Sequence, residues 1–269
     1  MPPKLSSYDK AFFDETQFTS LRSAQEVVPL ILDLLEVKNV IDIGCGTGAW
    51  LSVFEQFGVS RVLGIDNASL NGAKLQIKEN QILKHDLLKT LELANDERFD
   101  LVTCLEVAEH LPASCAKQIV DNLTSLGSVV LFSAAIPHQG GTNHINEQWP
   151  EYWAKLFAEQ GYRVVDCLRA KIWQNDNVAY WYAQNLLLYV KEDDLAKYPK
   201  LEPYVQSTDP NQLTLIHPKT YIKNHDRFNS PVVIVLRFVW GIVPRRLRLY
   251  LIKPLDSLIW KHVSTKFKV

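Results

Sequence analysis

The segment from Val40 to Trp50 constrains the fold of this chain more than any other stretch. It reads VIDIGCGTGAW, an apolar run that ends in a turn containing Gly44, Gly46 and Gly48. This order predicts a buried strand, a tight turn and a helix whose first N–H groups can approach a nucleotide-like ligand. Asp42 precedes the turn, and its carboxylate suits a ligand with a free ammonium group better than a pyrophosphate.

A second carboxylate is expected beside the same ligand. Asp66 follows the next predicted strand, Arg61–Ile65, about twenty residues after the turn, where a ribose-binding acid belongs. Two further segments come in order along the chain, KHDL around Asp86 and FDLVTCLEVAEHL from Phe99 to Leu111. Four features in this order are more specific than a glycine turn alone.

These four features resemble the class I S-adenosylmethionine (SAM) dependent methyltransferases. The resemblance implies an α/β fold, a Rossmann-like, seven-stranded, mostly parallel sheet with helices on both faces, and SAM as the cofactor. A Rossmann domain that uses its glycines for packing or for NAD is the weaker alternative. The cofactor-binding residues that the resemblance implies are Asp42, Gly44, Cys45, Gly46, Gly48, Asp66, Asn67, Asp86, Leu87, Leu105 and Glu106.

The chain has 269 residues, of which 47% are hydrophobic, so it can bury a full core. We expect an N-terminal helical flap over residues 1–36, the SAM-dependent methyltransferase domain over residues 37–192 and a basic, apolar, amphipathic helical extension over residues 193–269. A docked terminal helix is the alternative for the first part. The four cysteines lack C-x-x-C spacing, so we expect buried thiols in a reducing compartment.

Periodicity predicts alternating strands and helices. The expected strands are 39–43, 61–65, 81–83, 101–105, 128–133, 163–167 and 185–190. The expected helices are 23–35, 49–57, 113–123 and 150–160. Runs that are apolar on both faces, such as Val129 to Phe132, favour a parallel sheet covered by helices.

Three residues are candidates for catalysis, Glu109, His110 and His144, on the loops after the fourth and fifth expected strands. Methyl transfer to a hydroxyl requires alignment of donor and acceptor and removal of a proton. His144 or His110 is the expected general base, because an imidazole is available near neutral pH. The alternatives are that His110 caps or braces its loop and that His144 is a solvent-exposed loop residue.

No metal is expected, although a metal site is a specific alternative. Glu106, Glu109 and His110 have the E-x-x-E-H spacing of the small-RNA 2′-O-methyltransferases, and His138 or His144 could complete a set for Mg²⁺ or Mn²⁺. The same segment also occurs in metal-free relatives.

The expected acceptor is an oxygen of a sugar, a glycan or a lipid-linked glycan precursor. Residues 5–192 resemble bacterial methyltransferases associated with glycan loci, on the stretches LEVAEHLP, LFSAAIPHQGGTNHINEQWPEYW and WYAQNLLLYV. Stacking and amide groups that would suit a sugar are Trp149, Trp153, Asn143, Asn146 and Gln148. The alternatives are a natural-product or RNA 2′-hydroxyl methyltransferase and an inactive scaffold.

The C-terminal extension is the basic part of the chain. Residues 219–269 hold eleven Lys or Arg against two Asp or Glu, whereas the remainder is acidic, so we expect no DNA partner. Basic residues alternating with Leu, Ile and Trp over residues 231–269 predict peripheral contact with the inner face of a membrane, and packing on the domain or a dimer contact is the alternative. Without a secretory signal pattern, the expected location is cytoplasmic.

Overall fold

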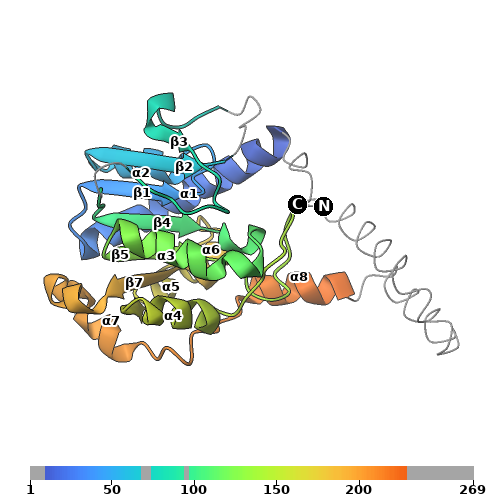
Figure 1. Ribbon diagram of the computed structural model, residues 1–269. Helices are drawn as coiled ribbons and strands as arrows, with labels where there is room; N and C mark the ends of the chain where they lie inside the picture. The colour runs from blue at the N-terminus through green and yellow to red at the C-terminus, as the bar shows by residue number, and fades with distance from the viewer. Residues whose placement is uncertain (1–9, 68–73, 94–96, 229–269) are drawn as a thin grey trace, which may run out of the picture. The chain divides into compact units, whose positions relative to one another are not determined.

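In the computed structural model, which describes residues 10–67, 74–93 and 97–228, the chain forms a seven-stranded sheet with helices on both faces (Figure 1). The strands follow one another across the sheet in the order β3-β2-β1-β4-β5-β7-β6. They are β1 (Asn39–Ile43), β2 (Arg61–Asp66), β3 (Ile82–Lys84), β4 (Leu101–Leu105), β5 (Val129–Ser133), β6 (Tyr162–Val165) and β7 (Leu187–Lys191).

Strand direction defines one functional edge. β1 pairs in parallel with β2 and β4, and β3 and β5 extend the sheet in the same direction. Only β7 runs against its neighbours β5 and β6 among the strands described. This is the Rossmann-like, mostly parallel sheet predicted from the sequence, and the prediction of fold class is confirmed. Ligands of such sheets bind beyond the carboxyl ends of the strands.

Helices complete the α/β pattern. The α-helices are α1 (Lys10–Leu34), α2 (Ala49–Gln56), α3 (Ala116–Leu126), α4 (Pro150–Glu159), α5 (Arg169–Ile172), α6 (Tyr180–Asn185), α7 (Glu202–Ser207) and α8 (Pro218–Phe228). The 3₁₀ turns are η1 (Glu79–Gln81), η3 (Ala108–His110), η4 (Ala113–Cys115), η5 (Glu192–Lys197) and η6 (Pro199–Leu201).

Two apolar clusters, one on each face of the sheet, form the core. On one face, α1 buries Val27, Val28 and Ile31 against α2 and the strands. On the other face, α3 and α4 bury side chains such as Leu123 and Phe157. Because both faces are covered, β4 and β5 are buried along their whole length, as their apolar sequences require.

The chain divides into two compact units, residues 1–217 and 218–269. The first unit contains the whole sheet. No helix in the described part of the chain is long and apolar enough to cross a membrane. The segment 231–269, for which membrane contact is predicted, lies outside the described residues. That prediction and the predicted division at residues 36 and 192 therefore stay predictions.

Candidate active site

The glycine turn between β1 and α2 passes close to neighbouring side chains at two of its glycines. Gly44 and Gly48 have φ angles of +83° and +81°, in the left-handed region that favours glycine. A Cβ on Gly44 would lie 2.4 Å from the Val107 side chain, and one on Gly48 would lie 2.6 Å from that of Ile77. Only glycine therefore fits at these two positions without a shift of the neighbouring chain.

Asp66, the last residue of β2, lies against the same turn. The backbone N–H of Gly46 donates to Asp66 Oδ2 at 2.8 Å. The N–H groups of Gly44 and Cys45 donate to the carbonyl of Ile65, at 2.7 and 3.1 Å. The two regions predicted to bind the cofactor thus meet at the carboxyl ends of β1 and β2, and Asn67 is exposed beside them.

Asp42 lies buried in β1 with 3% of its surface exposed. Its Oδ1 accepts a hydrogen bond of 2.6 Å from the Thr103 hydroxyl. Burial raises the pKa of Asp42 to about 7, the hydrogen bond from Thr103 opposes the rise, and the nearby charge of Asp66 adds to it. A bound cation would favour the ionised form.

The loop after β3 brings Asp86 to the same edge. The backbone N–H of His85 donates to the carbonyl of Asp66 at 3.1 Å, which joins this loop to the end of β2. Asp86 is half-buried, its Oδ1 accepts from the N–H of Leu88, and Leu87 is buried beside it. Asp86 therefore follows β3, the strand beside β2, at the same edge of the sheet as the other predicted cofactor residues.

Glu106 follows Leu105 at the end of β4 with a left-handed φ of +55°. Its carboxylate accepts hydrogen bonds from Gln139 Nε2 at 3.0 Å and Asn185 Nδ2 at 3.1 Å. Burial raises the pKa of Glu106, while hydrogen bonds with Asn185, Ser133 and Gln139 oppose the rise.

Sequence reasoning missed the buried amides that hold Glu106. Gln139 Oε1 accepts from Gln184 Nε2 at 3.0 Å and from Asn185 Nδ2 at 2.9 Å. All three amide residues are buried. The sequence feature that could have revealed these amides is the pair Gln184 and Asn185 just before the apolar strand β7, because amides in such a position must find partners inside the protein.

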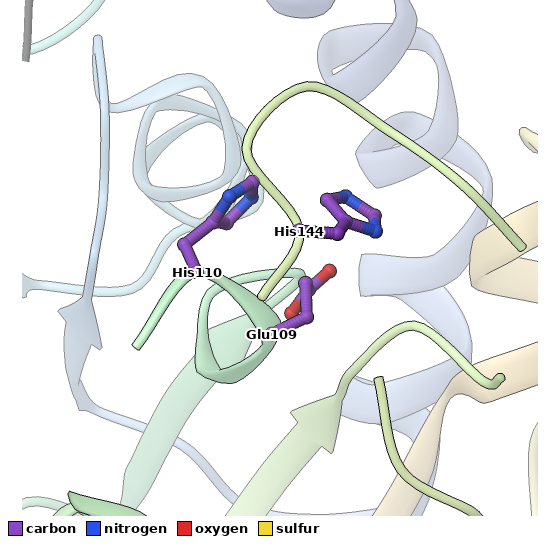
Figure 2. A group of neighbouring side chains, drawn as sticks. All are labelled: Glu109, His110 and His144. Carbon is purple, nitrogen blue, oxygen red and sulfur yellow. The ribbon is translucent and has the colours of Figure 1, made fainter. Parts of the chain in front are cut away.

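The three predicted catalytic residues lie together (Figure 2). Glu109 and His110 belong to η3 after β4, and His144 belongs to the loop between β5 and α4. The N–H groups of Ile145 and Asn146 donate to the carbonyl of Glu109 at 2.9 and 3.1 Å, which ties the two loops together. The rings of His110 and His144 are 4.9 Å apart between centroids and nearly perpendicular.

Burial controls the charge of this group. The Glu109 side chain is fully buried, which raises its pKa well above the usual range, and the charge of Glu106 raises it further. Burial lowers the pKa of His110 to about 4, the charge of His144 lowers it further, and a backbone hydrogen bond with Asn143 opposes the shift. His110 is therefore neutral at physiological pH.

Glu147, which sequence reasoning also missed, organises the His144 loop. Its Oε1 lies 2.9 Å from His144 Nδ1 and accepts from the N–H of Gly140 at 2.7 Å, and its Oε2 accepts from the N–H of His138 at 2.8 Å. Burial tends to raise the pKa of Glu147, but these hydrogen bonds outweigh burial and lower it. The sequence feature that could have revealed Glu147 is that it is a single acidic residue in a loop otherwise rich in hydrogen-bond donors.

Comparison with known proteins assigns this chain to a family. A family profile described as a methyltransferase domain matches residues 13–167, which is more than half of the chain. The chain belongs to the methyltransferase-domain family. The predicted enzyme class, a SAM-dependent methyltransferase, and the predicted cofactor are thereby confirmed.

Curated relatives of this methyltransferase carry one name. The ubiquinone biosynthesis O-methyltransferase of Neisseria meningitidis serogroup C is 32% identical over 125 residues, covering 42% of this chain and 52% of its own. The protein of the same name from Acinetobacter baylyi is 33% identical over 132 residues, covering 44% and 55%. The chain thus spans about half the length of these relatives.

Among solved structures, the methyltransferase is similar to magnesium protoporphyrin IX methyltransferase from Synechocystis PCC 6803 with bound SAH. The two chains are 21% identical, and the match covers 66% of this chain and 87% of the other with a TM-score of 0.47.

The relatives correct the predicted acceptor of this methyltransferase. They are named for ubiquinone biosynthesis, so the prediction of a sugar, glycan or lipid-linked glycan acceptor is wrong. The likeness to a glycan-locus subgroup is not supported either. The same names do not match the alternatives of a natural-product or RNA 2′-hydroxyl methyltransferase or an inactive scaffold.

Side-chain positions give a physical reason for this correction. Trp153, expected to stack on a sugar, is 2% exposed and packs on Phe132 with ring centroids 5.2 Å apart. Asn146 Oδ1 accepts from Gln148 Nε2 at 3.0 Å, so these two amides are paired with each other. The helical spacing of Pro150, Trp153 and Phe157 could have shown that Trp153 faces the core.

Proposed function

We propose that this methyltransferase transfers a methyl group from SAM to a hydroxyl oxygen of a quinone-related aromatic ring. The observation that carries the proposal is the similarity, at 32–34% identity, to several proteins named ubiquinone biosynthesis O-methyltransferase. The methyltransferase-domain family profile matches residues 13–167, which contain the glycine turn.

The donor side of the proposal uses the residues at the ends of β1, β2 and β3. The Asp42 carboxylate would face the ammonium group of SAM, Asp66 would accept hydrogen bonds from the ribose hydroxyls, and Asp86 would lie by the adenine. Charge-assisted hydrogen bonds of this kind contribute about twice as much as neutral ones. The glycine turn would allow the backbone to approach the methionine part closely.

The acceptor side offers apolar surface for a ring. Ile145 and Trp149 follow His144 on its loop and are 53% and 41% exposed. An aromatic ring gains more from contact with such side chains than a sugar with many hydroxyl groups does. Since Asn146 and Gln148 are paired with each other, hydrogen-bond groups on this loop are fewer than its composition implies.

Transfer itself requires alignment and loss of one proton. The acceptor oxygen attacks the methyl carbon of SAM in line with the departing sulfur, the carbon–sulfur bond breaks, and the hydroxyl proton must leave. We place Glu109, His110 and His144 at that hydroxyl, because they follow β4 and β5 at the carboxyl edge of the parallel strands, where the proposed SAM residues also lie.

The test is methyl transfer from labelled SAM by the purified full chain to three acceptors. The first is a hydroquinone ring that carries a further free hydroxyl group ortho to one of its two hydroxyls. The second is the same ring with every oxygen methylated, and the third is a free hexose. We expect label only in the first. Label in the hexose, or no label in any acceptor while calorimetry shows SAM binding, would overturn the proposed acceptor.

An acceptor-side variant gives a matched control. Ile145→Ser removes exposed apolar surface beside His144 without touching the residues proposed to hold SAM. We expect a several-fold higher KM for the ring acceptor and an unchanged dissociation constant for SAM.

A further inference from the structure

We propose that Glu109, His110 and His144 form a binding site for one divalent transition-metal ion. Each residue offers one ligand atom, and these three atoms all lie within 4.8 Å of one another. Figure 2 shows the three side chains gathered from two loops, η3 and the loop after β5. Separations of this size allow small side-chain adjustments to bring all three ligand atoms to one ion, at about 2.0–2.2 Å each.

The Glu109 side chain is the independent observation that points to a ligand. It is 0% exposed, and neither Oε1 nor Oε2 has a side-chain hydrogen-bond partner among the described residues; only the backbone at Glu109 and Ala135 lies close enough to stabilise its ionised form. A buried carboxylate without a charged partner is costly, and pairing with a cation offsets part of that cost. The two histidines beside it are the other donors that such a cation needs.

His144 is held as metal-binding histidines are. Its Nδ1 lies 2.9 Å from Glu147 Oε1, and a ring nitrogen that donates to a carboxylate leaves the lone pair on the other nitrogen, Nε2. A Cβ on Gly141 would lie 2.1, 2.4 and 2.7 Å from three atoms of this ring. The nearest of these atoms is Nε2, so glycine at position 141 leaves this nitrogen free of a side chain that would cover it.

The structure also narrows the ligand set. Glu106 uses both carboxylate oxygens to accept amide hydrogen bonds, and His138 is exposed. The four-residue set considered from the E-x-x-E-H spacing therefore reduces to two imidazoles and one carboxylate. This mixed set favours a transition-metal ion over Mg²⁺, which prefers oxygen ligands.

Three protein ligands leave coordination positions open for another molecule. As a consequence that rests on the proposed function, the acceptor hydroxyl would occupy an open position. A divalent ion lowers the pKa of a coordinated hydroxyl, so the oxygen attacks the methyl carbon as an alkoxide or phenoxide after its proton leaves to solvent. His144 then acts as a ligand and not as the general base.

The experiment is titration of the full chain, purified without a polyhistidine tag and treated with a chelator, with Co²⁺. Bound Co²⁺ is followed by its visible absorption, and Zn²⁺ is then added as a competitor. We expect one Co²⁺ per chain for the wild type and displacement by one Zn²⁺. The variants Glu109→Gln and His144→Ala should lose the signal, and Glu147→Gln should weaken binding about 10–100-fold because His144 loses its charged partner.

The matched control is His138→Ala, which removes an exposed histidine from the same loop and keeps the backbone hydrogen bond to Glu147. We expect its Co²⁺ binding to equal that of the wild type, and SAM binding measured by calorimetry shows that each variant is folded. No saturable Co²⁺ binding by the wild type, or equal loss in His138→Ala and Glu109→Gln, would overturn the site. Because absorption is measured without an acceptor, a failed ring-methylation assay contradicts the proposed function alone.

Discussion

Asp42 is a carboxylic acid kept from water in the central strand of the sheet. Its carboxylate accepts a hydrogen bond from the Thr103 hydroxyl, and burial raises the pKa of Asp42 to about 7. A group of this kind lowers folding stability whenever it is ionised. Its presence is explained by a cationic ligand, since an ammonium group would stabilise the ionised form.

Replacement of Asp42 should make stability less dependent on pH. Because the pKa of Asp42 is higher in the folded protein than in the unfolded one, the free energy of unfolding of the wild type falls as pH rises from 3.8, the unfolded pKa, to about 7, the folded pKa. Over this range Asp42→Asn should become more stable than the wild type, by roughly 2–4 kcal/mol at pH 7.5. Urea unfolding from pH 4.5 to pH 7.5 measures this.

The same variant should bind SAM about 10–100-fold more weakly, because it lacks the carboxylate proposed to face the ammonium group. Calorimetry at pH 7.5 checks this loss. Parallel stability curves for the two proteins would show instead that Asp42 is ionised throughout.

Residues whose role is local were predictable, and residues whose partners are distant were not. The need for glycine at position 44 follows from its place in a strand–turn–helix pattern. Gln139 was not recognised as structural, because its partners Glu106 and Gln184 lie 33 and 45 residues away. Trp153 was wrongly predicted to stack on a sugar, because the prediction considered its residue type and not its helical spacing from Pro150 and Phe157.

The sheet strands were predicted within two residues of their observed ends. β1 and β4 agree at both ends with the predicted ranges 39–43 and 101–105, because a buried parallel strand is a continuous apolar run between polar residues. Helical starts were less certain: residues 113–115 form the turn η4, and α3 begins at Ala116. The short helix α6 was not among the predicted elements.

One buried arginine joins three elements that sequence reasoning left unconnected. Arg169, in α5, is 1% exposed and donates to Asp166 Oδ2 at 2.7 and 3.0 Å. It also donates to the carbonyl oxygens of Gln184, in α6, and Leu213. The segment before α8 is thereby fixed to the same part of the core as α5 and α6.

Arg169→Met should destabilise the protein by about 3–5 kcal/mol, because it leaves the Asp166 carboxylate and two buried carbonyl groups without their donor. The control is Arg163→Met, which breaks an exposed pair with Glu192 of 3.3 Å. That change should cost no more than about 1 kcal/mol. Urea unfolding followed by far-ultraviolet circular dichroism gives both values, and equal values would contradict the role assigned to Arg169.

At the scale of the whole molecule, the enzyme class could be predicted and the acceptor could not. The class depends on four features that are predicted to bind the same cofactor and come in a fixed order, from Asp42 to Glu106. The acceptor depends on which loop side chains reach solvent. Trp149, at the end of the loop after β5, is exposed, whereas Trp153, four residues later in α4, is buried, a difference that composition does not show.

Deletion of residues 231–269 should separate catalysis from membrane contact. The sheet and every predicted cofactor residue belong to the unit of residues 1–217, so the shortened chain should keep the SAM affinity of the full chain. The full chain should sediment with vesicles that contain anionic lipid, less at high salt, and the shortened chain should not. Vesicles of neutral lipid are the control, and equal sedimentation of both chains would rule out a membrane role for the extension.

The Glu147 carboxylate fixes the loop after β5 through three contacts, with the N–H groups of His138 and Gly140 and the ring of His144. Side chains between these contacts, at Thr142, Asn143 and Ile145, are exposed and contribute none of them. Libraries that vary Thr142 and Ile145 can therefore search for new acceptors while the reacting groups keep their places; Asn143 is kept because its φ of +60° is in the left-handed region that few residues adopt. A library that varies Glu147 would yield mostly inactive proteins.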